Sequence, residues 1–283
     1  MVSRRLLMAL LILSSVAPGA SACGRQSQEP LRVLAAQSLV DAFTAMGAAF
    51  ERAHPDVRVE LTTASSGQLR AQVEAGAPAD VFASASQHHM DLLAEQKLIV
   101  PDGRLDFAGN RMVLIAPKGS SLTAPAELTR ADVRHVAIGD WSHVPAGRYA
   151  RQVLERHSLL EPLKPKLRRC QHVRQVLTYV AAGEVEAGLV FRTDAAREPE
   201  RVEVVWTAPP ADHTAIRLPI ATLAKSGRPA EARRFVAFVT SAAGQAIMKE
   251  HGFVVPAPDV SAVQHDALGE PASPNGQVDA SSR

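Results

Sequence analysis

The sequence has few aromatic residues, few cysteines and almost no excess of either charge. Phe, Trp and Tyr together make up 4% of the 283 residues, and the formal net charge is +2. No basic run is interleaved with aromatic side chains, which argues against a dedicated nucleic-acid surface. Hydrophobic residues, in contrast, reach 46% against 21% charged residues. This composition can build the core of one large domain or two medium domains.

No apolar run is long enough to span a bilayer. The run Leu6–Leu13 follows Arg4 and Arg5, as in the hydrophobic region of a secretory signal peptide. The next stretch, 20–23, reads Ala-Ser-Ala-Cys and resembles a bacterial lipoprotein signal, in which Cys23 becomes the lipidated first residue. Ala-Ser-Ala also fits ordinary signal-peptidase cleavage. We expect an exported protein that is anchored to the membrane through Cys23. Acylation would leave the second cysteine, Cys170, without a disulfide partner.

The chain is organised around the stretch that follows Leu31. Leu31–Ala36 is apolar and suits a buried strand, and the apolar period then changes to that of a helix with Leu39 and Phe43 on one face. Ser38 lies at the junction. It could simply cap the helix, or it could belong to an anion site, because a helix start offers unpaired N–H groups and the positive end of the dipole.

Similar junctions recur along the chain. The alternating strand pattern of 57–63 runs into Ser65-Ser66-Gly67 and a helix, and the strand pattern of 136–139 reaches a helix that Pro145 opens. Strands that alternate with helices predict parallel α/β layers. From Pro258 onward Asp, Gln, Pro, Ser and Asn dominate, and we expect a disordered tail over 258–283.

The motifs at these junctions resemble those of the periplasmic molybdate-binding proteins, which are the receptors of ABC-type oxyanion importers. They appear in family order and spacing, and the similarity covers roughly residues 31–256. The matching stretches are Ala35-Ala36-Gln37-Ser38-Leu39, Ala64-Ser65-Ser66-Gly67, Glu74–Phe82, Gly139-Asp140, His143–Gly147 and Gly188-Leu189-Val190-Phe191. Each motif alone is weak, but their order over nearly the whole mature domain is specific.

The resemblance implies a two-lobed clamp. Each lobe would hold a mostly parallel sheet flanked by helices, and two crossover strands would join the lobes. The expected division is a signal peptide over 1–22, a tether over 23–30, lobe one over 31–112 plus 218–257, lobe two over 113–217 and the tail over 258–283. The resemblance further implies a monomer that is not an enzyme, carries no cofactor and passes molybdate, and also tungstate, to an ABC transporter permease.

The resemblance also carries over the ligand contacts. Ser38 and Ser66 would donate hydroxyl and backbone N–H bonds from lobe one, and Ala146 and Val173 would donate backbone N–H groups from lobe two. The fifth contact departs from the family, because Phe191 stands where the family commonly has a Tyr whose hydroxyl reaches the anion. Phe has no donor, and the loss of one hydrogen bond to a charged ligand could weaken binding by about 10- to 100-fold.

Other functions remain open at this stage. A serine nucleophile is disfavoured because no Gly-x-Ser-x-Gly elbow accompanies either serine. His88-His89 suggests a metal site, but adjacent residues point to different helix faces, and we expect a solvated helix face instead. Tyr149 and Tyr179, the only tyrosines, could bind ferric ion but are expected to pack. The same fold could also bind sulfate or a small organic anion.

Overall fold

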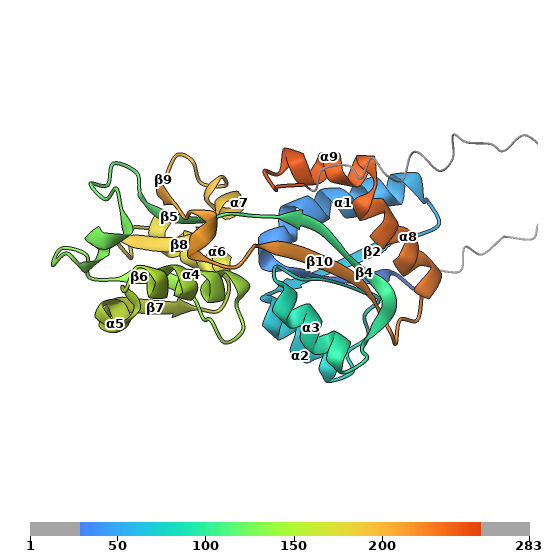
Figure 1. Ribbon diagram of the computed structural model, residues 1–283. Coiled ribbons are helices and arrows are strands. Elements are labelled where there is room, and N and C mark those ends of the chain that lie inside the picture. Colours follow the sequence, from blue (N-terminus) through green and yellow to red (C-terminus); the bar gives the residue numbers. More distant parts are fainter. Residues whose placement is uncertain (1–28, 256–283) are drawn as a thin grey trace, which may run out of the picture.

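The computed structural model describes residues 29–255. The expected signal peptide, the anchor Cys23 and the expected tail lie outside these residues. The chain forms two five-stranded sheets, with strand orders β2-β1-β3-β10-β4 and β7-β6-β8-β5-β9. The two sheets lie side by side in separate lobes, each flanked by helices (Figure 1). The two-lobed α/β fold predicted from the sequence is therefore confirmed.

Lobe one is built from the two ends of the described chain. Its parallel strands are followed by helices whose apolar faces cover the sheet, as α1 does with Phe43, Met46 and Phe50. Its strands are β1 (Leu31–Ala36), β2 (Val59–Ala64), β3 (Val81–Ala83), β4 (Ile99–Gly109) and β10 (Arg217–Leu223). Its helices are α1 (Val40–Ala53), α2 (Ser66–Glu74), α3 (Gln87–Glu95), α8 (Pro229–Thr240) and α9 (Ala242–Glu250), with the short 3₁₀ turn η1 (Gln37–Leu39) before α1.

Lobe two is continuous in sequence. Its strands are β5 (Met112–Pro117), β6 (Val136–Gly139), β7 (Leu167–Cys170), β8 (Ala187–Phe191) and β9 (Val202–Thr207). Its helices are α4 (Pro145–Arg156), α5 (Leu160–Leu163), α6 (Val173–Ala181) and α7 (Arg192–Ala195), with 3₁₀ turns η2 (Pro125–Thr129), η3 (Lys164–Lys166) and η4 (Pro210–Asp212). Cys170 ends β7, is buried and has a free thiol.

The sheets are mixed. In each lobe three strands pair in parallel, and the two remaining pairings are antiparallel. The prediction of parallel layers therefore applies to one part of each sheet. In lobe one, β4 leaves the sheet toward lobe two, whereas β10 returns from lobe two, so β10 runs antiparallel to both of its neighbours, β3 and β4.

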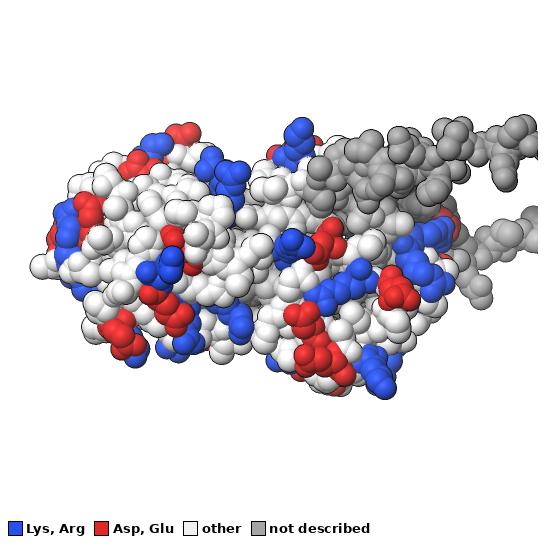
Figure 2. Space-filling view, in the orientation of Figure 1, with Lys and Arg blue, Asp and Glu red and all other residues white. Residues whose placement is uncertain are grey.

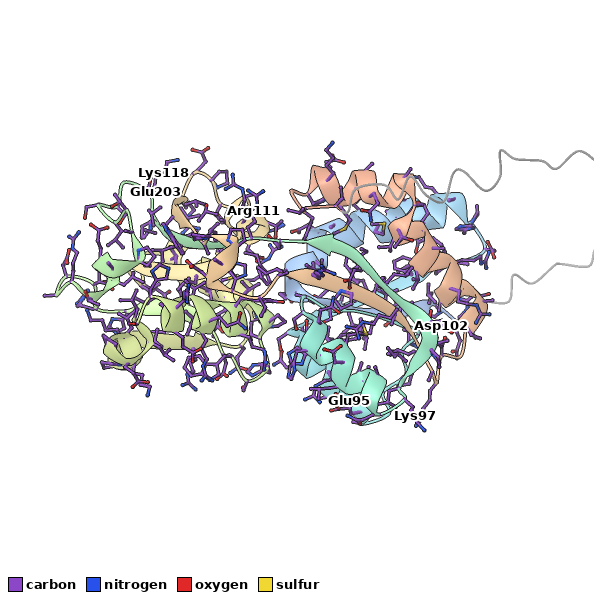
Figure 3. The ribbon with its side chains drawn as sticks, in the orientation of Figure 1. Glu95, Lys97, Asp102, Arg111, Lys118 and Glu203 are labelled. Atoms are coloured by element: carbon purple, nitrogen blue, oxygen red, sulfur yellow. The ribbon has the colours of Figure 1, made fainter. Side chains whose placement is uncertain are left out.

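Two crossings join the lobes. The chain leaves β4 through Asn110 and Arg111 to enter β5, and it returns from β9 to β10 through residues 208–216. Both segments are visible between the lobes in Figure 1, and Figure 3 labels Arg111 at the first of them. Val254 pairs with Gly109 beside this crossing, with Gly109 N–H donating to the Val254 carbonyl at 2.6 Å. The end of the described chain is thereby paired with the chain next to the first crossing.

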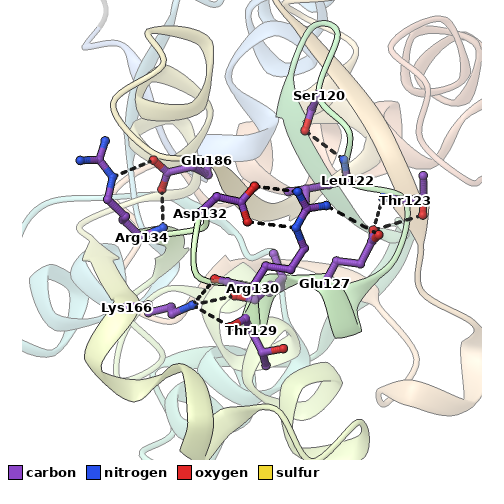
Figure 4. A network of polar contacts seen from close by, with 11 residues as sticks. Ser120, Leu122, Thr123, Glu127, Thr129, Arg130, Asp132, Arg134, Lys166 and Glu186 are labelled. Atoms are coloured by element: carbon purple, nitrogen blue, oxygen red, sulfur yellow. Dashed lines mark hydrogen bonds and ion pairs between the residues drawn. The ribbon is translucent and has the colours of Figure 1, made fainter.

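A polar network fixes the outer edge of lobe two (Figure 4). The Lys166 ammonium donates to the backbone carbonyls of Thr129 and Arg130 at 3.1 and 2.7 Å, and the Arg130 guanidinium contacts Asp132 at 2.6 Å. On the face shown in Figure 2, acidic and basic side chains are interspersed over both lobes. Among residues 29–255, no helix has the length and apolar character needed to cross a membrane.

Candidate functional site

Four helical segments begin at one cavity between the lobes. The 3₁₀ turn before α1 and the start of α2 come from lobe one, and the starts of α4 and α6 come from lobe two. The cavity is small, about 10 Å³. Its lining residues are Ala36, Gln37, Ser38, Ser65, Ser66, Ala85, Val144, Pro145, Ala146, His172, Val173 and Phe191. The structure thus brings all five predicted site residues together.

Ser38 is buried in the turn η1, and its hydroxyl has no hydrogen-bond partner within the described residues. The N-cap position of α1 is Leu39, and no side chain caps that helix. The interpretation of Ser38 as an N-cap is therefore wrong. An unsatisfied buried hydroxyl costs about 1–3 kcal/mol, so a ligand oxygen that accepts its hydrogen would recover much of that cost.

Ser66 is also free of a capping role, because Ser65 performs it. The Ser65 hydroxyl accepts the Gln68 N–H at 3.3 Å, and the Gln68 side-chain oxygen accepts the Ser65 N–H at 3.1 Å, which forms a capping box. Ser66, the first residue of α2, accepts the Ala85 N–H at 3.1 Å. Since this bond uses a lone pair only, the Ser66 hydroxyl hydrogen remains available for a ligand.

Ala146 and Val173 contribute backbone rather than side-chain chemistry. Ala146 is the second residue of α4, and Val173 is the first residue of α6. The first four N–H groups of a helix have no partner within the helix, so both groups are available at the cavity. Close packing brings α4 there: a side chain on Gly147 would collide with the Gly139 carbonyl at the end of β6. The Gly139–Gly147 pair therefore allows α4 to start directly beside the strand end.

Phe191 ends β8 and is almost fully buried. Its ring lies 6.1 Å from that of Tyr149, centroid to centroid, and Tyr149 also packs on His213. Burial raises the pKa of the Tyr149 phenol to about 12. Tyr149 is therefore buried against these two rings, as expected of a packing residue.

His172 lines the cavity but was missed from the sequence. It is the N-cap of α6, and its Nδ1 accepts the Gln175 N–H at 3.2 Å. Burial, followed by the nearby Arg174, lowers the pKa of His172. The neutral ring therefore carries its proton on Nε2 and is a donor there. A signal existed in the sequence, since His172 directly precedes Val173, Val176, Leu177 and Val180, whose spacing is that of one face of a helix.

The cavity lining contains no Asp, Glu, Lys or Arg. An anion in it would meet hydroxyl and N–H groups and the positive ends of helix dipoles, without a counter-charge. A cation would meet no carboxylate. Within the described residues no group of three or more His, Cys, Asp or Glu side chains is placed to hold a metal ion.

The expectation of a solvated face for His88-His89 is wrong for His89. His89 is 1% exposed and neither of its ring nitrogens has a hydrogen-bond partner in the described chain, whereas His88 is half-buried. Burial, and then the neighbouring charges, lower the pKa of His89 to about 3. The reason is that His89 lies on the same face of α3 as Leu93, four residues later, and this face packs into lobe one.

The lobes touch beside the cavity. The Gly67 N–H in α2 donates to the His143 carbonyl in the loop before α4, at 2.9 Å. A Cβ on Gly67 would lie 2.6 Å from that oxygen. Only glycine allows this approach between the lobes, so the Ser-Ser-Gly motif combines a cap, a donor and a contact between the lobes.

Comparisons with known proteins agree with this geometry. The family model of the bacterial extracellular solute-binding proteins matches residues 31–254. The chain is 34% identical over 226 residues to the molybdate-binding protein ModA of Haemophilus influenzae, covering 78% of this chain and 88% of that protein. It is 35% identical over 260 residues to the molybdate-binding protein ModA of Mycobacterium tuberculosis, covering 90% and 97%.

A solved structure shares the fold. The substrate-binding domain of a molybdenum ABC transporter protein from Clostridium difficile is 33% identical, with a TM-score of 0.64, and the match covers 81% of this chain and 99% of that domain. The chain belongs to the family of bacterial extracellular solute-binding proteins.

Proposed function

We propose that the protein captures molybdate outside the cytoplasm and delivers it to an ABC importer, without catalysing a reaction. Tungstate would bind through the same contacts, one ion per chain. The observation that carries the proposal is the cavity itself: four helix starts, the hydroxyls of Ser38 and Ser66, and no charged side chain. Such a site suits an oxyanion whose charge is neutralised by donors alone.

The donor set supports a fully deprotonated dianion. Ser38 and Ser66 would donate from lobe one, and Ala146 and Val173 from lobe two, so that the ion bridges the lobes. Hydrogen phosphate carries an O–H that needs an acceptor, and the cavity offers no carboxylate for it. The preference of the site for molybdate over sulfate would depend on the size of the closed cavity. The two moving bodies would be lobe one, which comprises 31–112 and 218–257, and lobe two, which comprises 113–217.

Phe191 favours a second candidate, a different oxyanion such as sulfate or a small organic anion. A ring without a hydroxyl lowers the number of donors at the position where the molybdate-binding family commonly has Tyr. The fold serves many ligands, so the fold alone does not choose between them. Molybdate is preferred because relatives about one-third identical over most of the chain bear that name.

The same proposal includes a lipid anchor at Cys23 that holds the protein near its permease. It rests on the Ala-Ser-Ala-Cys signal. A multiply acylated terminus holds to a membrane more stably than a single chain.

Elemental analysis tests the proposal. The mature chain is dialysed against molybdate, and molybdenum is counted by mass spectrometry. We expect about one molybdenum atom per chain, and far less in Ser38→Ala. Retention of phosphorus or sulfur instead of molybdenum, from an equimolar mixture, would select the second candidate.

A further inference from the structure

One carboxylate of lobe one is held by two guanidinium groups of lobe two. Asp41, in the first turn of α1, lies 2.6 Å from Arg174 (Oδ2 to Nη2), and Arg197 Nη1 contacts the same oxygen. Asp41 comes three residues after Ser38, and Arg174 directly follows Val173. The ion pairs therefore join the lobes at the elements that supply two of the proposed ligand contacts.

Arg174 is held from its other side by a buried acid. Its Nε lies 2.9 Å from Asp194 Oδ1, and Asp194 is fully buried in α7, three residues after Phe191. Burial raises the pKa of Asp194 to about 6, and the attraction of Arg174 opposes that rise. The side chain of Arg174 is 14% exposed, so it is fixed between Asp194 in its own lobe and Asp41 in the other.

The ion pairs lie next to the anion cavity but outside it. Asp41, Arg174 and Arg197 line a second hollow of about 250 Å³, and Ser38 lines both spaces. None of the three charged groups lines the anion cavity. They therefore do not act as direct ligand contacts. Together with Asp194 they make four charges, two of each sign, that balance one another.

We propose that Asp41, Arg174 and Arg197 form an interlobe lock that holds the clamp closed and sets how long a bound ion stays. Arg174 is a positioning residue: it transmits closure to the Val173 N–H, its neighbour in α6. The Asp41 pairs exist only when the lobes meet, so their loss raises the energy of the closed form and leaves each separate lobe unchanged. The identity of the ion rests on the proposed function, but the lock does not.

The test is Asp41→Asn with a matched control, Asp91→Asn. Asp91 pairs with Arg104 at 2.7 Å inside lobe one, so the control removes an ion pair of similar length that does not cross the lobes. Molybdate association and dissociation rates are measured by stopped flow. We expect Asp41→Asn to speed dissociation by about 5- to 30-fold and to change association by less than about 3-fold. Asp91→Asn should change neither rate by more than about 2-fold.

Equal rates in Asp41→Asn and Asp91→Asn would overturn the lock, as would an effect confined to association. Arg197→Gln guards against misfolding of the first variant. It removes one of the two partners, keeps Arg174 and should speed dissociation by about 2- to 5-fold. An unchanged dissociation rate in this folded variant would also count against the lock.

A measurement without ligand separates the lock from the proposed function. Failure of the wild type to bind any oxyanion contradicts the proposed function only. Small-angle X-ray scattering then compares the unliganded wild type with Asp41→Asn and Asp91→Asn. We expect a larger radius of gyration in Asp41→Asn alone, since the lobes separate more often. Identical scattering of all three proteins would overturn the lock.

Discussion

Replacement of Phe191 by Tyr tests whether the cavity lacks one donor. Phe191 ends β8 at the cavity and is 1% exposed, so a tyrosine ring can occupy the same space and add a single hydroxyl at its tip. If the hydroxyl reaches a ligand oxygen, it adds a hydrogen bond to a charged group.

The expected gain follows from two opposing quantities. A hydrogen bond to a charged group contributes about 1.5–3 kcal/mol, and removal of the new hydroxyl from water offsets part of that. The remainder corresponds to molybdate binding that is tighter by about 3- to 30-fold, and tungstate should follow because its oxygens are arranged similarly.

Isothermal titration calorimetry measures the affinity of wild type, Phe191→Tyr and the control Phe238→Tyr. Phe238 packs on Phe50 at 5.5 Å in lobe one and does not line the cavity, so the same chemical change there should leave affinity unaltered. Weaker binding of every oxyanion to Phe191→Tyr would refute the reasoning of a missing donor.

If Phe191→Tyr weakens binding, another donor already occupies the space of the new hydroxyl, and His172 is the candidate for that donor. Its Nε2–H is a donor, and His172→Asn removes that donor while an Asn side chain can still cap α6. If His172 already serves the ligand, His172→Asn weakens binding, and Phe191→Tyr in that background restores part of the loss.

Changes at Ser38, Ser65, Gly67, Asp194 and Cys23 test other parts of the proposal. Ser38→Ala should weaken molybdate binding by about 1–3 kcal/mol without lowering the melting temperature of the empty protein. Ser65→Ala should instead cost about 1 kcal/mol of stability, because it removes the cap of α2. If calorimetry and thermal melts show the reverse, Ser38 has a structural role. Gly67→Ala should weaken binding by about tenfold or more, since its Cβ would meet His143 only when the lobes are closed; an unchanged dissociation constant would contradict this. The folded-state pKa of Asp194 is raised to about 6, so the folded chain binds the proton more tightly than the unfolded chain. The free energy of unfolding, measured in urea relative to Asp194→Asn, should therefore fall as the pH rises from about 4 to 6. A rise of that free energy over the same window would contradict this prediction. Cys23→Ser should release the protein from the membrane fraction, and unchanged fractionation would exclude the lipid anchor.

The strand-to-helix junctions could be predicted because their signal is local. The change from an apolar run to a helical period around Ser38 is visible in the sequence, and β1 and α1 follow it. Strand β4 was missed because most of its middle is exposed and includes Pro101, Asp102 and Gly103, which read as a turn. Pairing with β10 continues on both sides of this segment, at Ile99 and from Arg104 onward, and the three residues lie at an irregularity in the register where Asp102 has a φ of 61°.

The candidate site, like the fold, could be predicted from the sequence only in part. Ser38 and Ser66 carry a chemical signal of their own, although the sequence did not show that Ser65 takes the capping role and leaves Ser66 free. Ala146 and Val173 would act through backbone N–H groups, which every residue except proline supplies, so only the family resemblance could point to them. The ion pairs of Asp41 depend on packing between segments far apart in the chain, and periodicity holds no information about that.

We propose that neutral donors in the cavity hold a tetrahedral oxyanion of molybdenum or tungsten. Competitive calorimetry of the mature chain against molybdate, tungstate, sulfate and phosphate tests it most directly. We expect one site per chain, molybdate and tungstate bound with similar affinity, sulfate at least about 100-fold more weakly and no measurable heat with phosphate. Binding of phosphate or sulfate in preference to molybdate, or no binding of any of the four ions, would contradict the claim.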